Sequence, residues 1–183
     1  MNSKLLLRSY LNNFLDLVKP DEDIVDQLVE VANLMETVNS DGKKTLVFGN
    51  GGSAAIASHF SVDLTKNAGI RCVNYNEASL ITCFANDYGF ERWVEKAVDF
   101  YGDEGDLMIL ISSSGSSKNV VNAARRAKEL NMSVITFTGF DGDNPLRKLG
   151  DINFWVDSKA YNIVEMTHHI WLLAIVDYII GYI

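Results

Sequence analysis

Short apolar runs alternate with longer amphipathic segments over most of the chain, from Lys44 onward. The runs have the length of buried β-strands, and the segments between them carry apolar residues at helical spacing. Alternation of this kind predicts a three-layer α/β/α fold, in which helices cover both faces of a five-stranded parallel sheet. The predicted strands are 45–48, 71–73, 107–111, 133–137 and 152–156, and the predicted helices are 53–67, 78–98, 118–130 and 162–181.

The first forty residues have the pattern of two further helices. Apolar residues recur at helical spacing from Leu5 to Val18 and again from Ile24 to Leu34. Between them, Pro20 and Asp21 end one helix and begin the next, which predicts an N-terminal helical hairpin. Such a hairpin either joins copies of the chain or covers the sheet, and the pattern fits both. We expect one domain, 1–183, with these helices in 1–40 and the α/β core in 44–183.

Two polar turns directly follow predicted strands. Gly49–Ser53 reads Gly-Asn-Gly-Gly-Ser, and Ser112–Ser117 contains five serines and one glycine. In each turn, hydroxyls and backbone N–H groups meet the positive end of the following helix, an arrangement that suits a phosphate group. Because ligands of parallel sheets bind at the carboxyl ends of strands, we expect the two turns to form one site. The alternative is that the serines only cap helices and build turns.

The composition limits the kinds of molecule that the chain is expected to bind. With 48% apolar and 22% charged residues, the chain is typical of a globular protein. Its 24 acidic and 16 basic residues give a net charge of −8, which opposes non-specific binding of nucleic acid. An anionic ligand would therefore be held by local dipoles and hydroxyls. The last apolar segment, Ile170–Ile183, is interrupted by Asp177, so we expect a buried helix there and no membrane association.

The cysteines and the N-terminal segment indicate in which cellular compartment the protein is found. Cys72 and Cys83 lie in apolar or strand-like surroundings, where we expect buried free thiols, with a disulfide as the alternative. The apolar run Leu5–Leu7 is too short for a signal peptide. These features together predict a cytoplasmic protein.

The two polar turns, with three further segments, resemble one known family. The further segments are His59, Asn86–Phe90 and Thr136–Gly139. Together they are similar to the sugar isomerase (SIS) domain, a flavodoxin-like α/β fold, and within it to the phosphoheptose isomerases. Those enzymes convert sedoheptulose 7-phosphate to D-glycero-D-manno-heptose 7-phosphate, which is used for lipopolysaccharide or capsule synthesis. The resemblance covers nearly the whole chain.

The resemblance implies a sugar phosphate as substrate. The serines would bind its phosphate, and Asn50 and Asp87 would bind its hydroxyls. The substrate-binding residues that it implies are Asn50, Gly51, Gly52, Ser53, Asp87, Ser112, Ser113, Ser114 and Ser117. It also implies a homotetramer in which neighbouring copies complete each active site.

The resemblance also implies a zinc site. In the family, a His and an acidic residue one helical turn apart join a Gln and a second His on the last helix. Here the first pair is His59 and Asp63, while Glu165 stands in the Gln position and Leu173 in the second His position. His169, or its neighbour His168, is the candidate replacement. The expected metal ligands are thus His59, Asp63, Glu165 and His169. The alternative is that His59 and Asp63 are only a hydrogen-bonded pair, and that Glu165 and His169 only stabilise their helix.

An isomerase of this family moves a proton between adjacent carbons through an enediol, which requires a base near both carbons. We expect Asp63 or Glu165 as the base and His169 as the acid or a ligand. One group of SIS proteins also lacks the family His and acts by binding the replication initiator protein. A non-catalytic, phosphosugar-binding regulator is therefore the second hypothesis, and a structural interaction protein with an empty pocket is the third.

Overall fold

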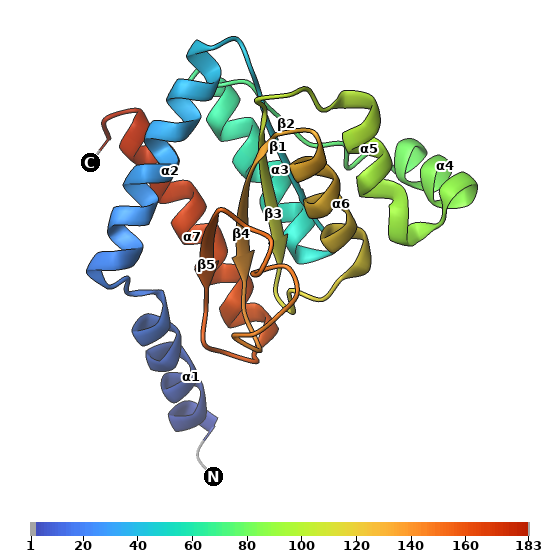
Figure 1. Ribbon diagram of the computed structural model, residues 1–183. Coiled ribbons are helices and arrows are strands. Elements are labelled where there is room, and N and C mark those ends of the chain that lie inside the picture. Colours follow the sequence, from blue (N-terminus) through green and yellow to red (C-terminus); the bar gives the residue numbers. More distant parts are fainter. Residues whose placement is uncertain (1–2, 183) are drawn as a thin grey trace.

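The structure is a computed structural model that describes residues 3–182, and its centre is a parallel sheet (Figure 1). The strands are β1 (Thr45–Gly49), β2 (Cys72–Val73), β3 (Leu107–Ser112), β4 (Ser133–Thr138) and β5 (Ile152–Trp155). They are ordered β2-β1-β3-β4-β5, and every pair is parallel. The predicted fold class is confirmed, and each predicted strand is found within two residues of its expected bounds.

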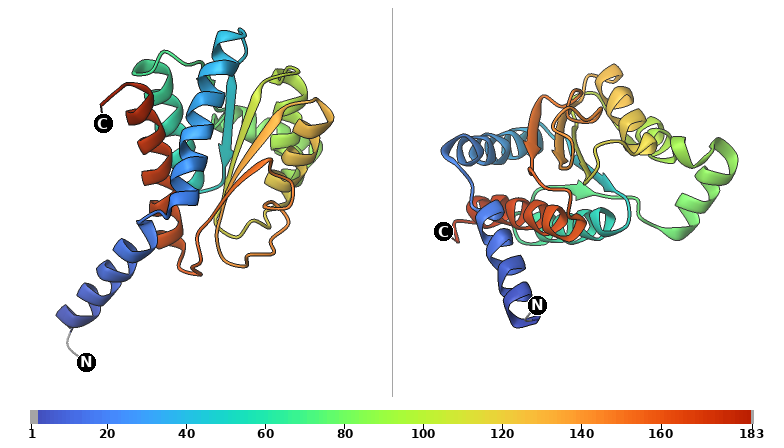
Figure 2. Two further views of the ribbon diagram at one scale, coloured as in Figure 1. Left: turned by 60° about the vertical axis from the view of Figure 1, so that its left-hand side comes forward. Right: turned by 90° about the horizontal axis from the view of Figure 1, so that it is seen from below.

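Helices cover both faces of the sheet (Figure 2). The helices α2 (Glu22–Ser40), α3 (Gly52–Lys66) and α7 (Tyr161–Ile179) lie on one face, and α5 (Trp93–Tyr101) and α6 (Lys118–Glu129) lie on the other. The helices on each face enclose a hydrophobic core against the sheet, and the side chains of β3 alternate between these two cores. Ile109 packs with the first group of helices and Leu110 with the second. All six residues of β3 are buried, as expected for a central parallel strand.

The single helix predicted over 78–98 is wrong, because the chain breaks at Gly89. Helix α4 (Ala78–Tyr88) ends there, a 3-10 turn follows (Phe90–Arg92), and α5 begins at Trp93. Gly89 has a φ of +87°, in a region that glycine adopts far more readily than other residues. Helix α4 has no buried residue and lies beyond α5, at the edge of the molecule (Figure 1).

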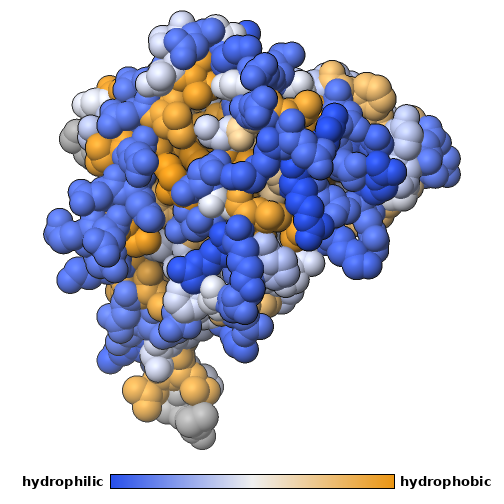
Figure 3. Space-filling model, in the orientation of Figure 1, coloured by the Kyte–Doolittle hydropathy of each residue, from blue (hydrophilic) through white to orange (hydrophobic). Residues whose placement is uncertain are grey.

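The two N-terminal helices are present, but they lie nearly end to end, and α1 does not fold back along α2. Helix α1 (Ser3–Val18) projects from the body of the molecule and has no buried residue (Figures 1 and 2). It is attached at its end, where the indole N–H of Trp171 on α7 donates a hydrogen bond to the carbonyl of Val18 at 3.1 Å. Apolar surface is visible where α1 projects from the molecule (Figure 3). Among the apolar side chains of α1, Leu5, Leu7 and Leu15 are exposed by 60% or more.

The structure corrects two predictions about burial, one for the cysteines and one for the C-terminal helix. Both cysteines are free thiols as expected, but only Cys72 is buried, and Cys83 is exposed on α4. The C-terminal helix is buried on one side only: Trp171 and Leu172 are in the core, whereas Ile170 is 46% exposed. Among the described residues no helix is both long and apolar enough to cross a membrane.

Candidate active site

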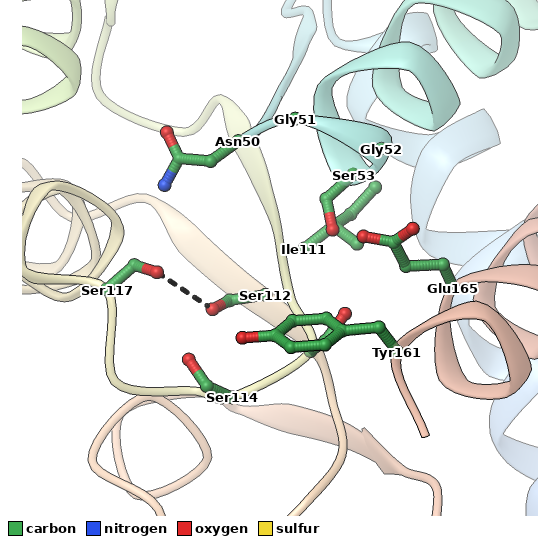
Figure 4. A pocket seen from close by; sticks show the side chains of 11 residues that line it. Asn50, Gly51, Gly52, Ser53, Ile111, Ser112, Ser114, Ser117, Tyr161 and Glu165 are labelled. Carbon is green, nitrogen blue, oxygen red and sulfur yellow. Dashed lines mark hydrogen bonds between the residues drawn. The ribbon is translucent and has the colours of Figure 1, made fainter. Parts of the chain in front are cut away.

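A cavity of about 260 Å³ opens where β1 and β3 end side by side (Figure 4). The chain leaves β1 for α3 on one face of the sheet and leaves β3 for α6 on the other, which is where ligands of such sheets bind. Nearly all of the residues predicted to bind substrate meet here. The cavity is lined by Asn50, Gly51, Gly52, Ser53, Ile111, Ser112, Ser113, Ser114, Ser117, Tyr161 and Glu165.

The turn after β3 is held in shape by Gly115. Its φ is +61°, and its N–H donates to the carbonyl of Ser112 at 3.0 Å. A Cβ here would stand 2.8 Å from the Cβ of Asn144, so both the backbone angle and the space require glycine. Asn144 in turn accepts a hydrogen bond from the N–H of Arg147 at 2.9 Å. The serines around Gly115 are therefore presented by a fixed backbone.

The hydroxyls in this turn are poorly satisfied by the protein itself. The Oγ of Ser113 is buried and has no hydrogen-bond partner among the described residues. Ser112 donates to Ser117 only at 3.5 Å, the upper limit for a hydrogen bond. Because a buried hydroxyl without a partner costs free energy, these groups fit a ligand that accepts hydrogen bonds.

Three helices begin at the cavity and none has a side-chain cap. Residues Gly51, Ser117 and Ala160 are the N-caps of α3, α6 and α7, and no acidic residue lies in the first turn of any of them. Helix α2, far from the cavity, is capped by Asp21, which accepts from the N–H of Ile24. The positive ends of three helix dipoles thus face the cavity. The Glu165 carboxylate lies against the start of α3, at Gly52, and the ends of α6 and α7 favour a further anion there.

The amide side chain of Asn50 is fixed beside this anion site. Asn50 and Asn119 exchange two hydrogen bonds, at 3.0 and 2.8 Å, across the gap between β1 and α6. Asn119 is buried and Asn50 half-buried. Asn50 is therefore held at the wall of the cavity, where the resemblance places a contact to the sugar.

Glu165 is the one carboxylate that lines the cavity, on the side of Gly52 and Ser53 (Figure 4). Burial raises the pKa of its carboxyl above the ordinary value. Of the predicted catalytic residues, Glu165 alone shares the cavity with the serine turn 112–117 and the uncapped helix ends, which we call the phosphate cradle.

Tyr161 is a lining residue that the sequence analysis missed. Its ring packs edge-on against Phe140, with centroids 4.8 Å apart, and its hydroxyl points across the cavity toward the serine turn (Figure 4). Nothing in the sequence marked Tyr161, which directly precedes the predicted helix 162–181, as a binding residue. Helical periodicity shows which side chains face a core, but not which of them line a cavity formed by distant loops.

His59, Asp63 and His169 form a second cluster, outside the cavity and farther along α3 and α7. The Nδ1 of His59 and the Nε2 of His169 are 2.9 Å apart, and the Nε2 of His59 is 3.3 Å from an Asp63 carboxylate oxygen. Burial and the neighbouring His59 lower the pKa of His169, and Asp63 opposes this. His168 does not join this cluster, because it is fully buried with its Nε2 2.9 Å from the carbonyl of Thr138.

The residues present do not fit a zinc site in this arrangement. Glu165 lines the cavity, while the other three expected ligands lie beyond it, and Leu173 offers no donor. The facing nitrogens of His59 and His169 share one hydrogen bond, so their lone pairs do not both point to a common centre. Within residues 3–182, no three His, Cys, Asp or Glu side chains are placed to hold a metal ion together. Zinc stays a prediction.

Asp87 does not line the cavity. It is exposed on α4, where the side-chain amide of Asn86 donates to one carboxylate oxygen at 2.9 Å and the thiol of Cys83 is 3.7 Å from the other. The prediction that Asp87 binds the sugar therefore has no support from the position of this residue within one copy of the chain.

Comparison with known proteins agrees with this geometry. The SIS domain model matches residues 9–139. A phosphoheptose isomerase of Fusobacterium nucleatum is 35% identical over 94% of this chain and 92% of its own length, and one of Helicobacter pylori is 33% identical over 97% and 95%. The solved structure of a phosphoheptose isomerase from Neisseria gonorrhoeae superposes with a TM-score of 0.90 at 30% identity, covering 97% of this chain and 98% of its own. The chain belongs to the SIS domain family.

Proposed function

We propose that this protein is an aldose–ketose isomerase of phosphorylated sugars, with sedoheptulose 7-phosphate as substrate and D-glycero-D-manno-heptose 7-phosphate as product. The observation that carries the proposal is the presence of a phosphate cradle and one carboxylate, Glu165, in the same cavity. The relatives named phosphoheptose isomerase, similar over nearly their whole length, support this choice of substrate.

The cradle binds the phosphate group of the substrate. The hydroxyls of Ser112, Ser113 and Ser117 and the uncapped N-terminal end of α6 supply donors and partial positive charge without any lysine or arginine in the lining. This matters in a chain with a net charge of −8, where the overall field repels an anion. The sugar carbons are then fixed relative to Glu165 on the opposite wall.

Glu165 is the base that moves the carbon-bound proton. Its carboxylate takes a proton from C1 of the ketose, which gives the enediol, and returns it to C2, which gives the aldose. The carboxylate shares the cavity with the phosphate cradle, and burial already raises the pKa of its carboxyl toward the working pH of a general base. Asp63, the other candidate base, lies outside the cavity.

A second candidate function is favoured by Leu173, which can neither bind a metal nor carry a proton. A chain that binds the phosphosugar without converting it would act as a regulator. The position of Glu165 weighs against this alternative, because a carboxylate beside a phosphate cradle weakens binding of the anion through like-charge repulsion, and a binding site alone gains nothing from it.

The assembly is proposed to be a homotetramer with shared active sites. Helix α1 leaves its apolar side chains uncovered, and a second copy of the chain would bury them. A neighbouring copy would also account for Asp87, which has no role within one copy. The two free thiols fit a reducing compartment, and we propose the cytoplasm.

The test is turnover of sedoheptulose 7-phosphate by the unmodified chain and by Glu165→Gln, which keeps the shape of the side chain but removes the base. We expect Glu165→Gln to lower kcat by about 10²- to 10⁴-fold, the usual contribution of a general base, while binding of the sugar phosphate is kept or strengthened. The matched control is Glu77→Gln, an exposed carboxylate ahead of α4. Turnover unchanged in Glu165→Gln would contradict the assignment of the base.

A further inference from the structure

Two side chains of α7 line the cavity, and their polar ends point to different sides of it. Tyr161 is the first residue of α7, and Glu165 follows one helical turn later. The Glu165 carboxylate lies against Gly52. The Tyr161 hydroxyl points away from this carboxylate, toward Ser112 and Ser114 (Figure 4). Of the two, Tyr161 is therefore the side chain that faces the serine turn of the phosphate cradle.

The hydroxyl of Tyr161 is available to a ligand. It makes no hydrogen bond with any residue that the structure describes. In the serine turn, the buried Oγ of Ser113 is likewise without a partner among the described residues. A ligand with several acceptor oxygens would satisfy both hydroxyls, because each can donate one hydrogen bond. A phosphate group is such a ligand, and no lysine or arginine among the described lining residues competes for it.

A residue with a strained backbone supports the ring of Tyr161. Phe140 has a φ of +55°, which a bulky residue rarely adopts, and its ring packs edge-on against Tyr161. The backbone is anchored on both sides of this ring. The N–H of Gly139 donates to the carbonyl of Ser113 at 3.0 Å, and the N–H of Phe140 donates to the carbonyl of Ser158 at 2.9 Å. Strain that the surrounding structure holds in place in this way is concentrated at functional sites.

The residue type makes the strain at Phe140 informative. Asn131 is the other described non-glycine residue with a positive φ, at 56°. Asparagine visits this region readily because its short polar side chain can form local hydrogen bonds, and phenylalanine has no such compensation. A glycine at position 140 would adopt the same backbone freely. What a glycine would lack is the ring that contacts Tyr161.

We propose that Tyr161 binds the phosphate group of the substrate, with its hydroxyl donating to a phosphate oxygen, and that Phe140 is the positioning residue that holds the ring of Tyr161. This inference rests on the proposed binding of a sugar phosphate, and it holds whether or not the bound sugar is converted. The phosphate is then held by the turn after β3 and by α7 together. Because Glu165 lies one turn farther along α7, the same helix sets the distance between the phosphate and the base.

The first measurement is the binding of inorganic phosphate, by titration calorimetry, to the full chain and to Tyr161→Phe, which removes the hydroxyl and keeps the ring. We expect the dissociation constant to rise about tenfold, the lower end for a hydrogen bond to a charged group, because Tyr161 is 59% exposed. The matched control is Tyr178→Phe, at the other end of α7, which should bind phosphate as the unmodified chain does.

Turnover of sedoheptulose 7-phosphate separates binding from chemistry. Tyr161→Phe should raise KM about tenfold and change kcat by less than about threefold, because the phosphate group is bound equally in the ground state and in the transition state. A fall in kcat with an unchanged KM would overturn the proposal, since it would place the hydroxyl at the reacting carbons.

The positioning role of Phe140 is tested by a double-mutant cycle. Phe140→Gly should raise the dissociation constant for phosphate about fivefold, within the range for residues in contact. In the Tyr161→Phe background the same substitution should have little further effect, because the hydroxyl that the ring holds in place is gone. Phe140→Leu, which fills more of the same space, takes its place in the cycle should the glycine variant not fold. An equal loss in both backgrounds would overturn the positioning role.

The outcomes separate the two proposals. Phosphate bound equally well by Tyr161→Phe and by the unmodified chain would overturn the role of Tyr161 alone. Absence of binding of both inorganic phosphate and sedoheptulose 7-phosphate by the unmodified chain would overturn the proposed function and this inference with it.

Discussion

The carboxylate of Glu165 lies directly against Gly52, so that a Cβ at position 52 would stand 2.7 Å from its carboxyl carbon. This contact joins the first turn of α3 to α7 at the wall of the cavity. Gly52 is not among the residues with positive φ, so the need for glycine comes from the neighbouring carboxylate and not from the backbone.

Gly52→Ala should therefore displace Glu165. We expect kcat to fall by about 10²-fold, because a shift of about 1 Å in a catalytic group has an effect of that size. A double-mutant cycle with Glu165→Asp, measured as turnover, checks the cause. The shorter side chain leaves room for the methyl group, so Gly52→Ala should cost less in the Glu165→Asp background than alone. Equal costs in both backgrounds would show that the contact is not responsible.

Ser113→Ala tests the phosphate cradle. Because the buried hydroxyl has no partner in the described structure, its removal should leave the unfolding free energy of the ligand-free protein unchanged or slightly raised. The binding free energy for inorganic phosphate, measured by calorimetry, should weaken by about 1.5–3 kcal/mol, the contribution of a hydrogen bond to a charged group. Ser116→Ala, on the exposed side of the same turn, is the control and should keep its affinity. An equal loss in both variants would argue against a direct contact from Ser113.

The stability of the fold should depend on pH through His168. Burial lowers the pKa of His168 from 6.5 to about 4. The neutral ring is favoured in the folded state, so this contribution is fully present above pH 6.5 and is lost as the pH falls toward 4. A shift of this size corresponds to about 3 kcal/mol. Urea unfolding at pH 7 and pH 4.5 should show a smaller loss for His168→Gln, which does not titrate, than for the unmodified chain. An equal loss would remove His168 as the cause.

Leu173→His tests whether the site lacks an acid. His59 on α3 faces His169 on α7, and one further turn along each of these parallel helices places residue 173 level with Asp63. If the chemistry needs no acid at this position, the new imidazole should change kcat by less than about threefold, while it adds a nitrogen that strengthens zinc binding, measured by titration calorimetry. An increase in kcat of tenfold or more would show that the chemistry requires an acid at the family position.

Much of the fold could be predicted because apolar runs and helical periodicity directly report burial on a sheet. The turns Gly49–Ser53 and Ser112–Ser117 were correctly expected at one site, since the carboxyl ends of adjacent parallel strands must meet. The break at Gly89 was missed because α4 and α5 are both amphipathic, and the short 3-10 turn Phe90–Arg92 between them does not clearly interrupt the helical periodicity. The exposure of Cys83 follows from the same break, which moves α4 away from the sheet.

The arrangement of the catalytic residues could be predicted only in part. Spacing placed His59 with Asp63 and Glu165 with His169 on shared helix faces, and both pairs lie along the contact between α3 and α7. Spacing within a helix does not report the register between two helices. That register brings His169 to His59 and leaves Glu165 with Gly52 at the cavity, so the expected set of four ligands divides into two groups.

The most direct test of the account is proton NMR of sedoheptulose 7-phosphate incubated with the purified full chain in D₂O. We expect the aldose heptose 7-phosphate to appear. Deuterium should enter at C2 of the aldose and at C1 of the ketose to the extent that the proton held by Glu165 exchanges with solvent while the enediol is bound, and both product and label should be lost in Glu165→Gln. Binding of the sugar phosphate without product and without deuterium exchange would contradict the central claim and favour a binding-only regulator.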